Sequence, residues 1–173
     1  MTDTPSDMHD GPQALSVRFH DLPALAGRSF VGDWFVIDEA KLPLFDEAVY
    51  SSENAYPLDM SEYPDGMVEG FHLLSLLDHL VNPLLLFSDG PCVGWNYGLD
   101  RVRFVSTVRA GQKIRVKGTV GAVTPKGSGY LVLCQCVIEV DGRDRPAMVA
   151  DWWTYWLPGP DRADSARTTH AHP

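Results

Sequence analysis

The feature that most constrains the fold is an apolar stretch from Met67 to Val81, with the sequence MVEGFHLLSLLDHLV. It contains no proline, and it ends at Asn82 and Pro83, where the proline disfavours helical geometry for the residue before it. As a helix, this stretch would be roughly 22 Å long. Five of its positions are leucines, spread over more than one stripe of the helix surface, so we expect most of its circumference to be buried. The sequence therefore predicts one long helix at the centre of the molecule.

The first turn of this predicted helix carries three residues that contribute little to packing, namely Glu69, Gly70 and His72. A helix N-terminus presents free backbone amides and a partial positive charge. Glu69 is either a general base or a residue that simply favours the helix N-terminus. His72 lies three residues later on the same face, where it can pair with Glu69. It either takes part in chemistry or is a buried histidine whose hydrogen bonds are satisfied.

Composition limits the class of protein and its partners. A chain of 173 residues, 45% of them hydrophobic, is expected to form one domain with a single core. The net charge of -9 argues against nucleic acid or an anionic membrane as a partner, because both need a basic face. No signal peptide is recognisable and the three cysteines are expected to be reduced, which together favour a cytoplasmic location. The chain has neither clustered metal ligands nor a Gly-rich phosphate loop, so we expect no metal and no cofactor.

Polar segments mark the ends of the domain. Residues 1–13 are expected to form a flexible N-terminal arm and residues 158–173 a flexible tail, which leaves 14–157 as the folded domain. Inside the domain, Val31–Ile37 has the composition of a strand. Asp38 follows it and can cap a short helix.

The segment between the short helix and the long one, residues 50–66, is too long to be a mere connection. It is polar and aromatic, and loops of this kind on a rigid scaffold often carry binding or catalytic residues. Glu53 is one candidate site residue from this segment. The candidate ligand contacts from the same segment are Tyr50, Ser52, Asn54, Tyr56 and Tyr63.

After the long helix the sequence changes to β-forming residues separated by turn signals such as Asp141-Gly142. Along the second of these segments, Ile114 and Val116 face one way, while Lys113, Arg115 and Lys117 face the other, as in a sheet with one solvated face. The sequence predicts an α+β fold in which an antiparallel sheet wraps around the helix. The expected strands are Val102–Val108, Lys113–Val120, Tyr130–Val140 and Pro146–Trp156.

Three blocks of sequence resemble the MaoC-like dehydratases, hotdog-fold proteins that include the (R)-specific enoyl-CoA hydratases. The blocks are Val68–Leu77, Trp95–Phe104 and Val108–Val116, and the segment from Pro146 to Trp153 is similar to the last strand of the family. The resemblance extends over roughly residues 30–157. It implies a hotdog fold, pairing of two copies into a homodimer or a higher oligomer, and a thioester site in the cleft between the copies. The second block contains Asn96 and Tyr97, which are either ligand contacts or residues that begin a strand.

The loop before the long helix departs from the family pattern. Family hydratases carry Asp-x-Asn-Pro-Ile/Leu-His there, and its Asp and His activate a water. In this chain the loop is residues 51–59. With the asparagines aligned, Ser52 replaces the acid and Pro57 the histidine. Shifted by one residue, Glu53 takes the acid position and Tyr56, or the leucine two residues later, lies near the histidine position.

At the helix start, only Gly70 matches the family pattern, as the backbone amide that would polarise a thioester carbonyl, and Glu69 stands where the family has histidine. The resemblance implies a lyase of the hydratase or dehydratase type with a non-standard site. Its expected substrate is a thioester, with a coenzyme A thioester as one candidate, or a related conjugated carbonyl compound. Glu69, Glu53 and His72 compete for the acid–base role. The alternatives are a non-catalytic acyl-binding subunit that partners a catalytic chain, and a thioesterase on the same fold.

Overall fold

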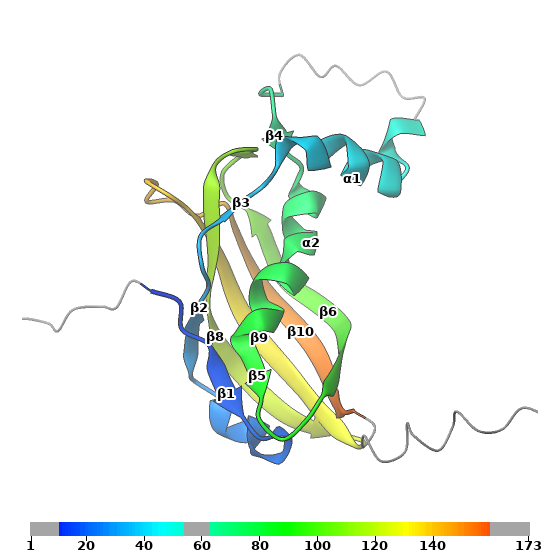
Figure 1. The fold of residues 1–173 in the computed structure, drawn as a ribbon, viewed down its shortest axis with the longest axis vertical. Helices are drawn as coiled ribbons and strands as arrows, with labels where there is room; N and C mark the ends of the chain where they lie inside the picture. The colour runs from blue at the N-terminus through cyan, green and yellow to red at the C-terminus, as the bar shows by residue number, and fades with distance from the viewer. Residues whose placement is uncertain (1–10, 54–62, 160–173) are drawn as a thin grey trace, which may run out of the picture.

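The computed structural model describes residues 11–53 and 63–159, in which one helix lies across a curved antiparallel sheet (Figure 1). The helix, α2, runs from Gly70 to Val81, and its buried residues face the sheet. No helix in the described ranges is long and apolar enough to cross a membrane. The α+β architecture predicted from the sequence is confirmed.

The main sheet has six strands, ordered β2-β8-β9-β10-β6, with β3 also paired to β8. All of its pairings are antiparallel. Strand β6 forms one edge, where it pairs with β10 alone. The strands are β2 (Ser29–Val31), β3 (Phe35–Val36), β6 (Cys92–Phe104), β8 (Lys113–Lys126), β9 (Gly129–Val140) and β10 (Met148–Pro158).

Short elements connect and close the ends of this layer. A parallel pair, β1 with β5, lies near the end of α2, and an antiparallel pair, β4 with β7, lies at its start. These strands are β1 (Leu15–Val17), β4 (Met67–Val68), β5 (Leu85–Phe87) and β7 (Val108–Arg109). The remaining helices are α1 (Leu42–Ala48) and the 3-10 turns η1 (Phe19–Leu25), η2 (Glu39–Lys41), η3 (Ser51–Glu53) and η4 (Asn82–Leu84).

The core lies between α2 and the inward-facing residues of the sheet. Alternate residues of β9 and β10 are buried, as the period of two in a strand requires. Gly118 of β8 faces this core. A side chain would not fit there, because the fully buried ring of Phe30 occupies the space: a Cβ on Gly118 would lie 2.3 Å from the Phe30 Cζ. Cys134 and Cys136 are free and buried side by side on β9, and burial raises the pKa of the Cys134 thiol to about 12.

The central helix differs from its prediction in two ways. It begins at Gly70, because Met67 and Val68 are extended and pair with β7. The expectation that most of its circumference is buried is wrong, since Phe71 is 73% exposed and Ser75 is also exposed. One flank of α2 therefore faces outward beside the edge strand β6.

The strands differ mainly in their bounds. Strand β6 begins at Cys92, ten residues before the predicted start, and β8 continues to Lys126. The strand predicted over Val31–Ile37 is divided into β2 and β3. Arg115, predicted on a solvated face, is buried: its guanidinium pairs with Glu139 at 2.9 Å and stacks on an indole ring.

The capping residue of the first short helical segment is confirmed, because the Asp38 carboxylate accepts a hydrogen bond from the Ala40 backbone amide at 3.0 Å. At the N-terminal boundary, Gln13 already pairs with Val31 through two backbone hydrogen bonds. The rest of the two predicted tails lies almost wholly outside the described residues.

Candidate functional site

A pocket of about 290 Å³ opens beside the first turn of α2. Helix α1 forms one wall and the segment leading into β4 forms another, so the pocket lies where three segments meet at one end of the molecule (Figure 1). Its lining is rich in acidic and polar groups. The lining residues are Leu42, Asp46, Tyr63, Pro64, Asp65, Gly66, Met67, Glu69 and His72.

His72 is the most enclosed polar group of this pocket, with only 8% of its surface exposed. Its imidazole stacks face to face on the ring of Phe45, with 4.4 Å between the ring centroids. Within residues 11–53 and 63–159, no group hydrogen-bonds its ring nitrogens. Burial lowers the pKa of His72 from its ordinary value of 6.5, and the carboxylates of Asp46 and Glu69 act in the opposite direction. The imidazole is therefore mainly neutral near pH 7 and is free to accept a proton.

Glu69 occupies the N-cap position of α2, in extended backbone conformation. Its backbone carbonyl accepts the first helical hydrogen bond, from the Leu73 amide at 2.9 Å, but its side chain makes no capping hydrogen bond. The carboxylate instead lines the pocket with His72. The structure thus brings together the two residues that the sequence placed on one helix face.

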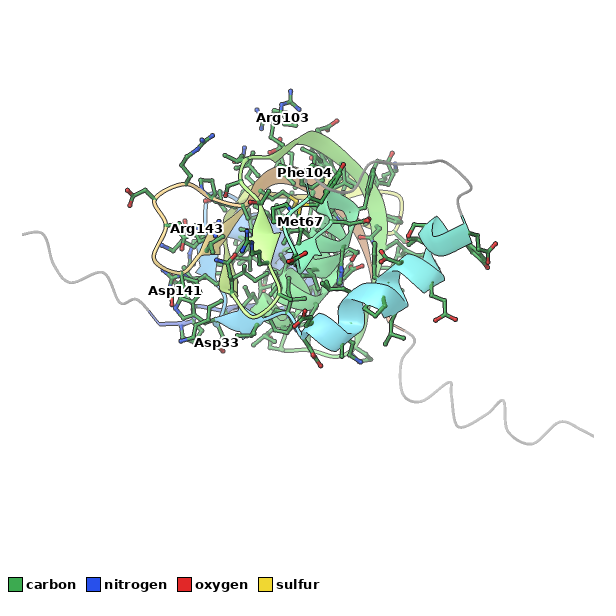
Figure 2. The ribbon with its side chains drawn as sticks, turned by 90° about the horizontal axis from the view of Figure 1, so that it is seen from above. Asp33, Met67, Arg103, Phe104, Asp141 and Arg143 are labelled. Atoms are coloured by element: carbon green, nitrogen blue, oxygen red, sulfur yellow. The ribbon has the colours of Figure 1, made fainter. Side chains whose placement is uncertain are left out.

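Gly70 lies against a neighbouring pocket, also of about 290 Å³, on the other side of Met67. Met67 lines both pockets, and Figure 2 shows it near Phe104 above the start of α2. A Cβ on Gly70 would lie 2.9 Å from the Phe104 ring. Close packing therefore accounts for a glycine here, and the Gly70 amide does not share one cavity with His72.

The predicted loop residues are dispersed. Tyr63 lines the His72 pocket and is about half exposed. Tyr50 is exposed beyond the far end of α1, with a backbone φ of 61°. Glu53 is exposed on η3. Asn54, Tyr56 and the side chain of Ser52 lie outside the described residues.

Asn96 and Tyr97 belong to a separate groove of about 380 Å³ between α2 and β6. The Asn96 side-chain amide donates a hydrogen bond to Asp78 of α2 at 2.9 Å and accepts one from the Trp152 indole of β10 at 2.8 Å. Asn96 therefore links the helix to the sheet. The Tyr97 hydroxyl accepts a hydrogen bond from Lys126 at 2.5 Å. These contacts account for both residues without a ligand.

Sequence reasoning missed Asp46, which lines the His72 pocket from α1. A signal was available in the sequence: Leu42 and Phe45 mark the inward side of a short helix, and Asp46 lies four residues after Leu42 on that side.

No group of three or more His, Cys, Asp or Glu side chains in the described part of the chain is arranged to hold a metal ion.

Comparison with known proteins places this geometry in context. No family model matches the chain. Nodulation protein N of Rhizobium leguminosarum bv. viciae is 31% identical over 146 residues, which cover 78% of this chain and 88% of that protein. The 3-hydroxyacyl-thioester dehydratase Z of Mycobacterium tuberculosis is 31% identical over 138 residues, which cover 76% of this chain and 90% of that protein.

Solved structures share the fold at lower sequence identity. A MaoC-like dehydratase from Rhodospirillum rubrum superposes with a TM-score of 0.57 and 19% identity, covering 78% of this chain and 94% of that one. The fluoroacetyl-CoA thioesterase FlK superposes with a TM-score of 0.52 and 12% identity, covering 84% and 97%. The hotdog fold expected from the sequence is therefore confirmed.

Proposed function

Since the chain belongs to the family of MaoC-like dehydratases and has their hotdog fold, we propose that it adds water to, or removes water from, a conjugated acyl thioester. The relative named as a 3-hydroxyacyl-thioester dehydratase supports this class of substrate. One observation carries the proposal: a buried, mainly neutral imidazole, His72, faces a pocket with three carboxylates and has no hydrogen-bond partner among the described residues.

His72 is the base in the proposed hydration of a 2-enoyl thioester. It takes one proton from a bound water while the water oxygen bonds to C3, and the π electrons between C2 and C3 move toward the thioester carbonyl to give an enolate. C2 then takes the proton from the His72 imidazolium, which restores the neutral ring. The sum is the addition of one water, and dehydration is the same path reversed.

Glu69 and Gly70 have supporting roles in this proposal. The Glu69 carboxylate accepts a hydrogen bond from the second O–H of the water and so fixes the direction of attack. The Gly70 amide, at the positive end of α2, donates to the carbonyl oxygen as the enolate forms, provided that the substrate extends past Met67 from one pocket to the next. Glu53, exposed on η3, has no role in it.

The test is a hydration assay with a short 2-enoyl thioester, followed by the loss of enoyl absorbance. We expect His72→Gln and Glu69→Gln to retain the fold and to lower kcat/KM by roughly 100-fold or more, because the first removes the base and the second removes the group that orients the water. His79→Gln is the matched control, since His79 lies on the same helix, is exposed and meets the Phe35 ring edge-on, away from the pocket.

A fully active Glu69→Gln variant would remove Glu69 from the mechanism. A wild-type chain that hydrates no enoyl thioester would overturn the proposal as a whole. Release of free thiol without hydration would instead assign the thioesterase chemistry of the structural neighbour, and ligand binding without turnover would assign an acyl-binding subunit.

The same proposal includes a homodimer and a cytoplasmic location. Strand β6 is a long edge strand with a row of exposed apolar side chains, which supports pairing with a second copy. The three cysteines are all free, which supports a reducing compartment.

A further inference from the structure

Asp46 faces the His72 pocket from an element that is otherwise loosely attached. Helix α1 has no fully buried residue, and Leu44 on its outer side is 52% exposed. Its inward contacts come from Leu42, Phe45 and Asp46, the first and last of which line the pocket while Phe45 stacks on His72. The imidazole is therefore enclosed by α1 itself, and Asp46 is the charged group that α1 brings with it.

The charged and titratable groups around His72 come from three segments. Helix α1 supplies Asp46, the start of α2 supplies Glu69, and the segment before β4 supplies Tyr63 and Asp65. None of the lining residues is a lysine or an arginine. The charged side chains that face a protonated imidazole in this pocket are therefore all acidic. The carboxylates of Asp46 and Glu69 both act to raise the pKa of His72, and Asp46 has the larger effect.

The contacts of the Asp46 side chain show no structural role. It makes no hydrogen bond or ion pair within residues 11–53 and 63–159. Its backbone carbonyl, in contrast, accepts a hydrogen bond from the Ser51 hydroxyl at 3.1 Å, a contact that a change of side chain leaves intact. A carboxylate that is partly buried, lacks a partner and is directed at a pocket shared with a neutral imidazole needs another explanation.

We propose that Asp46 is a positioning residue for His72: from α1, across the pocket, its carboxylate stabilises the imidazolium that exists while His72 holds the proton of water. The proposal rests on the hydratase function proposed above and makes α1 part of the active site. The aspartate and the histidine that act together are then Asp46 of α1 and His72 of α2. They do not come from the loop of residues 51–59, where the family pattern has its Asp and His. Opposite charges in a partly enclosed pocket attract more strongly than in water, which gives the pairing its effect on the reaction.

The experiment compares Asp46→Asn with the wild type in two measurements. The first is the pH dependence of kcat/KM for hydration of a short 2-enoyl thioester. We expect roughly tenfold or greater loss at the optimum, because the imidazolium is less stabilised, and a shift of the acid limb to lower pH, because a less basic imidazole stays neutral there. The second is an NMR titration of the His72 ring, in which the midpoint should move to lower pH.

Two further variants separate charge from structure. Glu47→Gln removes the same charge from the adjacent, exposed position of α1 and should leave both the pH profile and the His72 titration unchanged. Asp46→Glu keeps the carboxylate and should restore part of the lost activity, with an acid limb close to that of the wild type.

The outcomes separate the two proposals. An Asp46→Asn variant with an unchanged His72 titration and an unchanged pH profile would overturn the role of Asp46, while loss of turnover in His72→Gln would still support the hydratase. A wild-type chain without hydratase activity would overturn the proposed function, and the titration alone would then decide whether Asp46 and His72 are coupled.

Discussion

His72 is buried, yet it must gain and lose a charge if it is the base of the reaction. Burial disfavours the charged imidazolium, which is why the pKa of His72 lies below its ordinary value of 6.5 although the carboxylates of Asp46 and Glu69 act to raise it. The same balance sets two properties of the residue. It keeps the ring neutral and able to accept a proton near pH 7, and it makes the folded state less tolerant of protonation than the unfolded chain.

The pH dependence of stability follows from that balance. The unfolded chain binds a proton at His72 below about pH 6.5, whereas the folded chain resists it until a lower pH. The stabilisation that comes from the neutral ring is therefore complete above about pH 6.5, declines as the pH falls from there to the pKa of the folded state, and changes no further below it.

The variant His72→Gln should abolish this part of the decline. The measurement is urea unfolding of wild type and variant at several pH values between about 5 and about 8. The chain has six histidines, so the difference between the two proteins, and not either curve alone, isolates His72. Parallel curves with the same slope over this range would show that protonation of His72 is not coupled to folding.

At the scale of elements, the interior of the sheet depends on one close approach. Gly118 of β8 has Phe30 across its inner face, and a Cβ there would also lie 2.8 Å from the backbone oxygen of Gln135. Phe30 is fully buried and the Gln135 oxygen belongs to the paired strand β9, so neither can yield without disturbing the core. We expect Gly118→Ala to lower the free energy of unfolding by about 1–3 kcal/mol or more, as overpacked cores do.

Chemical denaturation of Gly118→Ala and of Gly11→Ala measures this effect. Gly11 is the control because a Cβ there would meet nothing within 4 Å and its backbone is not left-handed. Equal stability of the two variants would mean that the sheet relaxes around the added methyl group.

The elements that local sequence patterns determine were predicted, and those that depend on distant partners were not. The hairpins that join β8, β9 and β10 have turn signals and alternating residues, so their strands were expected. The first ten residues of β6 contain Gly94, Asn96 and Gly98, which disfavour strands, and only pairing with β10 makes them extended. At the site, the helical period predicted that Glu69 and His72 share a face, whereas the approach of Asp46 depends on how α1 lies against α2, which no local pattern records.

At the scale of the whole molecule, the two edges of the main sheet differ. On one side, β8 is covered by the short strands β2 and β3. On the other, β6 presents thirteen residues of edge strand, beside which the exposed flank of α2 lies (Figure 1). The large apolar side chains exposed along this side are Phe71, Val93, Trp95, Tyr97, Leu99 and Phe104. An edge that is long, apolar and open to solvent is a template for pairing with another strand.

We therefore expect a homodimer that pairs through β6, and a lysine on this edge should separate the two copies. Trp95→Lys places a charge where a 60% exposed indole would otherwise be covered by the second copy, and desolvating an unpaired ammonium group opposes association.

The control is Val36→Lys on β3, which changes a 46% exposed apolar residue at the opposite edge of the sheet. Light scattering after size exclusion should give twice the 19.1 kDa chain mass for the wild type and the control, and the single-chain mass for Trp95→Lys. A wild-type protein of single-chain mass would refute the dimer, whereas a Trp95→Lys variant that stays dimeric would place the interface on a surface other than β6.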